Sequence, residues 1–141
     1  MLRVRLLLAF AAALVLTSAI AQPAAAIQQF YKVFVSEYLD NHPDQQFADH
    51  VKKDVKCYVC HQGKERKHRN AYGQELAKLL NAKKDAKDTD KIVAALKTVA
   101  DQHVNPSDDK SDTFGARITA GKLPAGELDD LKKEPPGDDE K

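Results

Sequence analysis

The feature that most constrains this chain is the segment Cys57-Tyr58-Val59-Cys60-His61, which holds both of its cysteines. The pattern C-x-x-C-H is the attachment signature of c-type haem. Two sulfurs must reach two vinyl groups on one porphyrin edge, and the next residue must place its imidazole under the iron. A short helical turn with two intervening residues meets both requirements. The segment therefore predicts one covalent haem c, linked through Cys57 and Cys60, with His61 as the proximal iron ligand.

Three other interpretations of the cysteines stay open. A thioredoxin-like redox pair shares the C-x-x-C spacing, but it normally belongs to a βαβ pattern, and the sequence has none. A zinc site would need two further ligands, for which His61 together with His68 or His103 is available. A plain disulfide is the third alternative, because exported chains occupy oxidising compartments.

The N-terminal residues 1–21 have the pattern of an export signal. Two arginines precede an uncharged apolar run at 6–16, and Ala19-Ile20-Ala21 fits the small-x-small rule for cleavage. A second cleavage site follows Ala26. The apolar run is about half of the ~20 residues that a membrane-spanning helix needs, so an uncleaved anchor is the weaker alternative. We expect a signal peptide, a periplasmic or otherwise exported location, and no stable membrane span in the mature chain.

The charge balance bears on possible partners. Loss of residues 1–21 removes two arginines and no acid, which changes the formal net charge from +1 to −1. A dedicated nucleic-acid binder would carry a clear basic excess, so we expect no nucleic-acid partner. Lysines nevertheless cluster around the motif, and they form either a solvated basic face or a docking surface for acidic redox partner proteins. These lysines are Lys52, Lys53, Lys56, Lys64 and Lys67.

Apolar side chains recur at intervals of three and four, which predicts an all-α fold. The expected helices lie at 27–40, 44–57, 71–80 and 89–103, with a short helix or turn at 114–123. Asp44, and either Asp88 or Thr89, are expected N-caps. No alternating strand pattern stands out, and the polar residues 62–70 are expected to form a loop. The predicted organisation is a haem domain at 27–124, with an extra N-terminal helix, followed by a flexible acidic tail at 125–141.

The second axial ligand of the iron is not specified by the motif. The only methionine is Met1, which lies in the predicted signal peptide, so the mature chain cannot supply His/Met ligation. We favour His68 as the distal ligand, because it lies in a loop that can fold back over the haem, and His103 is the alternative. His42, His50, a lysine or an open five-coordinate iron remain possible.

Two further segments carry a family resemblance. Residues 69–73 read R-N-A-Y-G, and residues 113–124 read T-F-G-A-R-I-T-A-G-K-L-P. With the C-x-x-C-H motif, they resemble small exported bacterial monohaem cytochrome c proteins over roughly 47–124. The resemblance implies a cytochrome c-like helical domain, haem c and export. Tyr72, Arg69 and Asn70 are candidate contacts of the haem propionates, against the simpler interpretation of a core aromatic and a solvated loop.

These observations favour an electron-transfer protein, not an enzyme, in which the iron cycles between the ferrous and ferric states. One alternative is a haem-based small-ligand sensor, or a peroxidase-like protein, with an open iron site. A non-haem metal-binding protein is the other.

Overall fold

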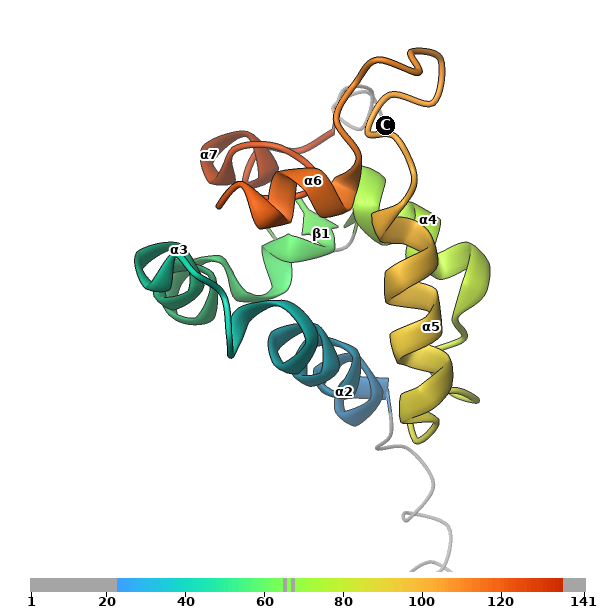
Figure 1. Cartoon of the computed structure of the whole chain (residues 1–141). Coiled ribbons are helices and arrows are strands. Elements are labelled where there is room, and N and C mark those ends of the chain that lie inside the picture. The colour runs from blue at the N-terminus through green and yellow to red at the C-terminus, as the bar shows by residue number, and fades with distance from the viewer. Residues whose placement is uncertain (1–22, 65, 67, 136–141) are drawn as a thin grey trace, which may run out of the picture.

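A computed structural model describes residues 23–64, 66 and 68–135, and this part of the chain is mainly helical, as predicted (Figure 1). The predicted signal peptide at 1–21 lies outside the described residues. The α-helices are α2 (Pro23–Phe34), α3 (Gln45–His50), α4 (Ala71–Leu79), α5 (Thr89–Ala100), α6 (Phe114–Thr119) and α7 (Leu128–Leu131). Within the described residues, no helix is long and apolar enough to cross a membrane.

Two predicted helices continue in a different helical form. Helix α2 runs into a π-helical turn at Val35–Leu39, and α3 runs into another at Val51–Val55. A 3₁₀ turn at Lys56–Val59 follows the second of these and carries the start of the C-x-x-C-H motif. The expected helices at 27–40 and 44–57 therefore exist, but each is a sequence of shorter helical pieces.

Side-chain caps start the helices where the sequence predicted. The Asp44 carboxylate accepts from the Phe47 N–H at 2.9 Å, at the start of α3. The Asp88 carboxylate does the same for the Lys91 N–H at 3.0 Å, which settles Asp88 over Thr89 as the cap of α5. Each cap satisfies an N–H that has no partner inside its helix.

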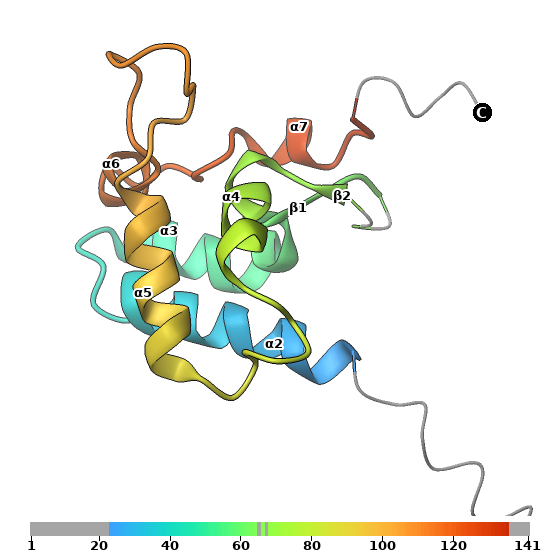
Figure 2. The same ribbon diagram turned by 90° about the vertical axis from the view of Figure 1, so that its right-hand side faces the viewer.

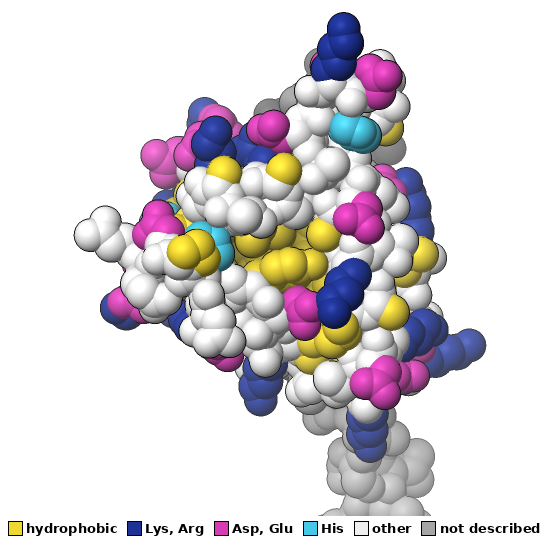
Figure 3. Space-filling model, in the orientation of Figure 1, with side chains coloured by type: hydrophobic (Ala, Val, Ile, Leu, Met, Phe, Trp, Pro, Cys, Tyr) yellow, Lys and Arg dark blue, Asp and Glu magenta, His cyan; other side chains and the backbone are white. Residues whose placement is uncertain are grey.

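The core lies where α2, α4, α5 and α6 meet, and α5 contacts the other three helices (Figures 1 and 2). Tyr72 of α4 is fully buried at its centre. Its ring centroid is 6.1 Å from that of Phe34 and 5.3 Å from that of Phe114. On the face seen in Figure 3, apolar side chains form the floor of a hollow between these helices. Tyr72 is thus the core aromatic that helical spacing predicted.

The structure differs from the expected loop at 62–70. Strands β1 (His61–Gln62) and β2 (His68–Arg69) form a short antiparallel hairpin in which His61 pairs with Arg69 and Gln62 with His68. Strands of two residues are too short to show alternation in the sequence. The motif histidine is therefore part of a hairpin.

The structure also differs from the expected tail at 125–141, as far as Pro135. Leu123 and Pro124 are buried, and α7 follows them. Leu131 is only 4% exposed, and its carbonyl accepts the Gly63 N–H at 2.9 Å. Burial of an apolar side chain and a backbone bond to the hairpin hold this segment against the domain.

Candidate functional site

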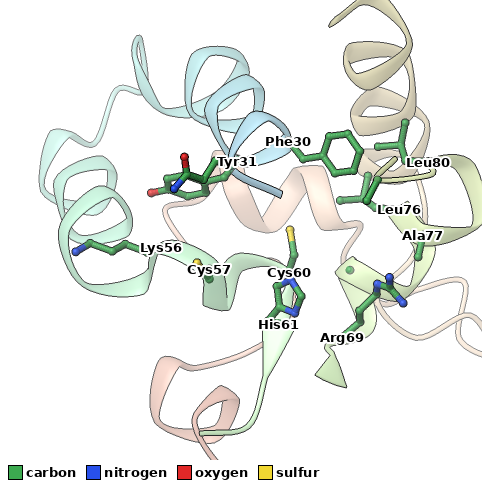
Figure 4. A pocket seen from close by; sticks show the side chains of 13 residues that line it. Phe30, Tyr31, Lys56, Cys57, Cys60, His61, Arg69, Leu76, Ala77 and Leu80 are labelled. Atoms are coloured by element: carbon green, nitrogen blue, oxygen red, sulfur yellow. The ribbon is translucent and has the colours of Figure 1, made fainter. Parts of the chain in front are cut away.

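One cavity brings the three motif residues together. It has a volume of about 190 Å³ and lies between α2, the 3₁₀ turn and α4 (Figure 4). Cys57, Cys60 and His61 line one side of it, and the Cys60 sulfur points into the space toward α2. Phe30 from α2 and Leu76 from α4 contribute apolar walls. The fold thus turns a linear motif into one side of an apolar pocket.

The two cysteines are free thiols in this structure. Desolvation, with a smaller contribution from the neighbouring Cys57, raises the pKa of the Cys60 thiol to about 12. A reactive redox pair depends on the thiolate, so a protonated Cys60 does not suit that role. Moreover, the described residues contain no cluster of three or more His, Cys, Asp or Glu side chains that could hold a metal ion. The thioredoxin-like and zinc interpretations gain no support from the geometry.

His61 is held as a neutral, oriented imidazole. Its Nδ1 lies 3.2 Å from the His68 carbonyl oxygen, and because a carbonyl only accepts, Nδ1 must donate. In the neutral ring, Nε2 then carries the lone pair. Desolvation lowers the pKa of His61, and so do the charges of Arg69 and Arg66, whereas the backbone bonds to His68 and Arg66 offset this only in part. A neutral imidazole with its other nitrogen bonded to a carbonyl is the usual form of a metal-binding histidine.

Asn70 connects the motif to α4. Its Oδ1 accepts from the Gly73 N–H at 3.0 Å and caps the helix. Its Nδ2 donates to the carbonyls of Tyr58 at 2.9 Å and Val59 at 3.1 Å, and it lies 3.3 Å from the His61 carbonyl. Asn70 is only 2% exposed, so it is neither a solvated loop residue nor turned toward the pocket opening. It fixes the backbone of the C-x-x-C-H turn from behind.

Gly73 allows α4 to lie directly on that turn. A Cβ at this position would be 2.0 Å from the Cys60 carbonyl oxygen, a separation that no side chain tolerates. The glycine is needed because backbone meets backbone there. Together, Asn70 and Gly73 explain the R-N-A-Y-G segment as the support of the motif.

The segment 113–124 builds the opposite side of the core, away from the pocket. Thr113 caps α6 by accepting from the Ala116 N–H at 3.1 Å, and Phe114 and Ile118 are buried. Gly121 has a φ of 70°, which ends the helix in the left-handed region. This segment contributes packing, and none of its residues lines the cavity.

Comparisons of the chain with known protein families, with curated proteins and with solved structures found no match. Functional inference therefore depends on the pocket and its supporting residues. Sequence reasoning identified Cys57, Cys60 and His61, but it missed the roles of Asn70 and Gly73. Asn is a preferred residue directly before the first turn of a helix, where its side chain accepts from a backbone N–H. Asn70 stands directly before the helix predicted at 71–80, and this position would have indicated its role.

The structure does not bring the favoured distal ligand, His68, into the pocket. The His68 side chain lines a second, polar hollow beside Gln62 and Gln74. Its backbone carbonyl, in contrast, bonds to His61 itself. Antiparallel pairing of β1 with β2 produces this arrangement, because it makes the two histidines neighbours across the hairpin.

The remaining histidines also lie outside the cavity. The His103 Nδ1 is 2.6 Å from the Ser111 carbonyl oxygen, in the turn after α5. His42 is 6% exposed, and its Nε2 lies 2.9 Å from the Ile118 carbonyl oxygen. The His50 Nδ1 is 2.9 Å from an Asp54 carboxylate oxygen on the exposed surface. Each has a structural partner away from His61.

Ion pairs with nearby acids offset part of the positive charge of the expected lysine surface. Lys52 lies 2.9 Å from Asp40, and Lys53 lies 2.6 Å from Asp49, so nearby acids offset both. Lys56 lines the pocket, and Arg69 lines it on the opposite flank of His61 (Figure 4). Lys67 falls outside the described residues. The positive charge at the pocket therefore comes from one predicted lysine and one arginine.

Proposed function

We propose that this protein is an exported monohaem c-type cytochrome that transfers electrons. The observation that carries the proposal is the convergence of Cys57, Cys60 and a neutral His61 on one apolar pocket. The C-x-x-C-H spacing of these residues also matches the chemistry of haem attachment. The family resemblance and the signal-peptide pattern support a cytochrome c-like domain acting in the periplasm.

The residues present fit a haem in their chemistry. Cys57 and Cys60 would form the two thioether links, and the His61 Nε2 would bind the iron. Phe30 and Leu76 would shield the ring from water, which favours a defined reduction potential. The bound haem would supply a one-electron ferrous/ferric couple, and the chain would supply ligation, burial and docking.

The size of the cavity sets a condition on this fit. Its volume of about 190 Å³ is below the roughly 300–1,000 Å³ of typical ligand sites. A porphyrin would therefore need more space than the present cavity provides. Lys56 and Arg69, which both line the cavity, would suit electron exchange with an acidic partner protein.

Covalent haem is tested by expressing the full chain in a host with c-type maturation. After acid denaturation and extraction with organic solvent, haem should stay with the polypeptide. Replacement of both cysteines, Cys57→Ser with Cys60→Ser, should abolish retention, whereas the exposed control His50→Ala should retain it. Haem that moves into the solvent phase, or a chain that carries none, refutes the proposal.

A second function, binding of a small ligand at the iron, is favoured by one observation. Among the described residues that line the pocket, His61 is the sole histidine, and none is a methionine. An iron held there would keep an open position unless another group approached. The reduced protein would then be high-spin and bind carbon monoxide readily, whereas a low-spin spectrum without carbon monoxide binding would favour electron transfer alone.

A further inference from the structure

The C-terminal segment 128–134, here called the strap, closes over the hairpin that carries His61. The Gly63 N–H donates to the Leu131 carbonyl at 2.9 Å. The next amide, that of Lys64, donates to the Glu134 Oε1 at 2.8 Å. Leu131 is buried beneath this contact. The strap thus holds two successive amides of the hairpin loop.

The loop is shaped to receive the Glu134 carboxylate. Gly63 has a φ of 83°, and a Cβ at this position would clash with that carboxylate. On the other strand, His68 Nε2 lies 3.8 Å from Glu134 Oε2. One carboxylate therefore faces both halves of the hairpin.

The hairpin needs such an external support. Two-stranded hairpins are marginally stable at best by themselves, and each strand here has only two residues. Arg66, in the loop, has a φ of 56°, which an ordinary side chain disfavours. A bond from a backbone N–H to an ionised carboxylate is stronger than one between neutral groups.

We infer that Glu134 is a positioning residue for His61, and this inference rests on the proposed role of His61 as an iron ligand. Glu134 binds the Lys64 amide and so holds the loop. The loop keeps β2 in register with β1, and that register places the His68 carbonyl on the His61 Nδ1. A donor bond from Nδ1 raises the basicity of the imidazole toward the metal. The strap therefore tunes the proximal side of the site from the far end of the chain.

The test compares Glu134→Ala, Glu134→Gln and the control Asp129→Ala in the full chain. Asp129 belongs to the same strap and carries the same charge, but its side chain is 92% exposed and forms its ion pair with Lys132, at 3.6 Å. In the haem-loaded protein, Glu134→Ala should lower the iron–histidine stretching frequency and raise the midpoint potential. Glu134→Gln, whose amide oxygen still accepts from the Lys64 N–H, should restore most of both values, and Asp129→Ala should change neither.

A second measurement does not need haem. Exchange of the Lys64 N–H with solvent should accelerate at least about tenfold in Glu134→Ala, as expected for the loss of one hydrogen bond to a charged group. In the same samples, the ¹⁵N shifts of His61 should report loss of the protonated Nδ1 form. Haem retention is scored separately, so a chain without haem refutes the proposed function while the His61 shifts still test the strap.

Two outcomes would overturn the inference. Faster Lys64 exchange with unchanged His61 shifts would show that Glu134 holds the loop without positioning the histidine. An equal change in Asp129→Ala would show that net charge, and not the contact with the hairpin, is the cause.

Discussion

Replacement of Asn70 is the sharpest test of how the motif is held. In Asn70→Ala, α4 loses its cap, which costs about 1 kcal/mol. The carbonyls of Tyr58 and Val59 also lose their donor, at about 1–3 kcal/mol for each buried acceptor left unpaired. The sum is about 3–7 kcal/mol, a large share of the roughly 5–15 kcal/mol that stabilises a typical domain.

Two companion variants separate these contributions. Asp88→Ala removes a similar cap, on α5, that serves no other segment, and it should cost about 1 kcal/mol. Asn70→Asp keeps the capping oxygen but turns a second oxygen toward the carbonyls, so it should destabilise at least as strongly as Asn70→Ala. Urea unfolding of each variant, followed by circular dichroism, measures the differences.

If Asn70→Ala and Asp88→Ala lose the same stability within about 0.5 kcal/mol, the donor bonds from Asn70 to the turn contribute nothing measurable. An Asn70→Asp variant as stable as the wild type would lead to the same conclusion. In either case, the C-x-x-C-H turn would hold its shape without the asparagine.

Four further outcomes are expected. Gly73→Ala should prevent stable folding, since its methyl group would overlap the Cys60 carbonyl, and the measurement is the yield of folded protein after expression. In the haem-loaded protein, His68→Ala and His103→Ala should each leave the spin state unchanged in absorption spectra, because neither side chain lines the pocket. Conversion of one variant to high spin would instead identify that histidine as the distal ligand. In the chain without haem, Cys60 should react with iodoacetamide at pH 8.5 at least about tenfold more slowly than in the urea-unfolded chain. The reason is that a pKa of about 12 keeps the folded Cys60 thiol protonated, whereas an ordinary cysteine with a pKa of about 8.5 is half ionised at this pH. The same raised pKa means that the folded state loses stability as the pH rises above about 8.5, because the unfolded chain then releases a proton that the folded chain retains.

Local patterns in the sequence predicted most of the helices. The caps at Asp44 and Asp88 and the apolar intervals of α4 and α5 involve residues within four positions of each other, so their physics is visible in a short window. The sequence pattern also grouped Cys57, Cys60 and His61 by their spacing along the chain, and the structure places all three on one cavity. Their role in binding haem stays a prediction.

The features that were missed depend on distant contacts. The β1–β2 hairpin is too short to show a pattern in the sequence; it begins at His61 of the motif, and its loop bonds to the strap through the Gly63 N–H. The strap itself was hidden because Leu128 and Leu131 lie among charged residues. Lys56, directly before the motif, has a φ of 49°, which nothing in a lysine side chain would indicate. The position of the His68 side chain could not be predicted either, because it is set by the pairing of β2 with β1.

The contact between the strap and the hairpin can form only after the end of the described chain has been synthesised. Residues 128–134 are the last of the described segments to be translated, and translocation through a membrane also proceeds along the chain. Until they arrive, the Lys64 amide and the loop around Gly63 have no partner from the C-terminal end. The hairpin that carries His61 therefore gains this support late, and a prematurely terminated chain would keep the C-x-x-C-H motif but lack the carboxylate that contacts its hairpin.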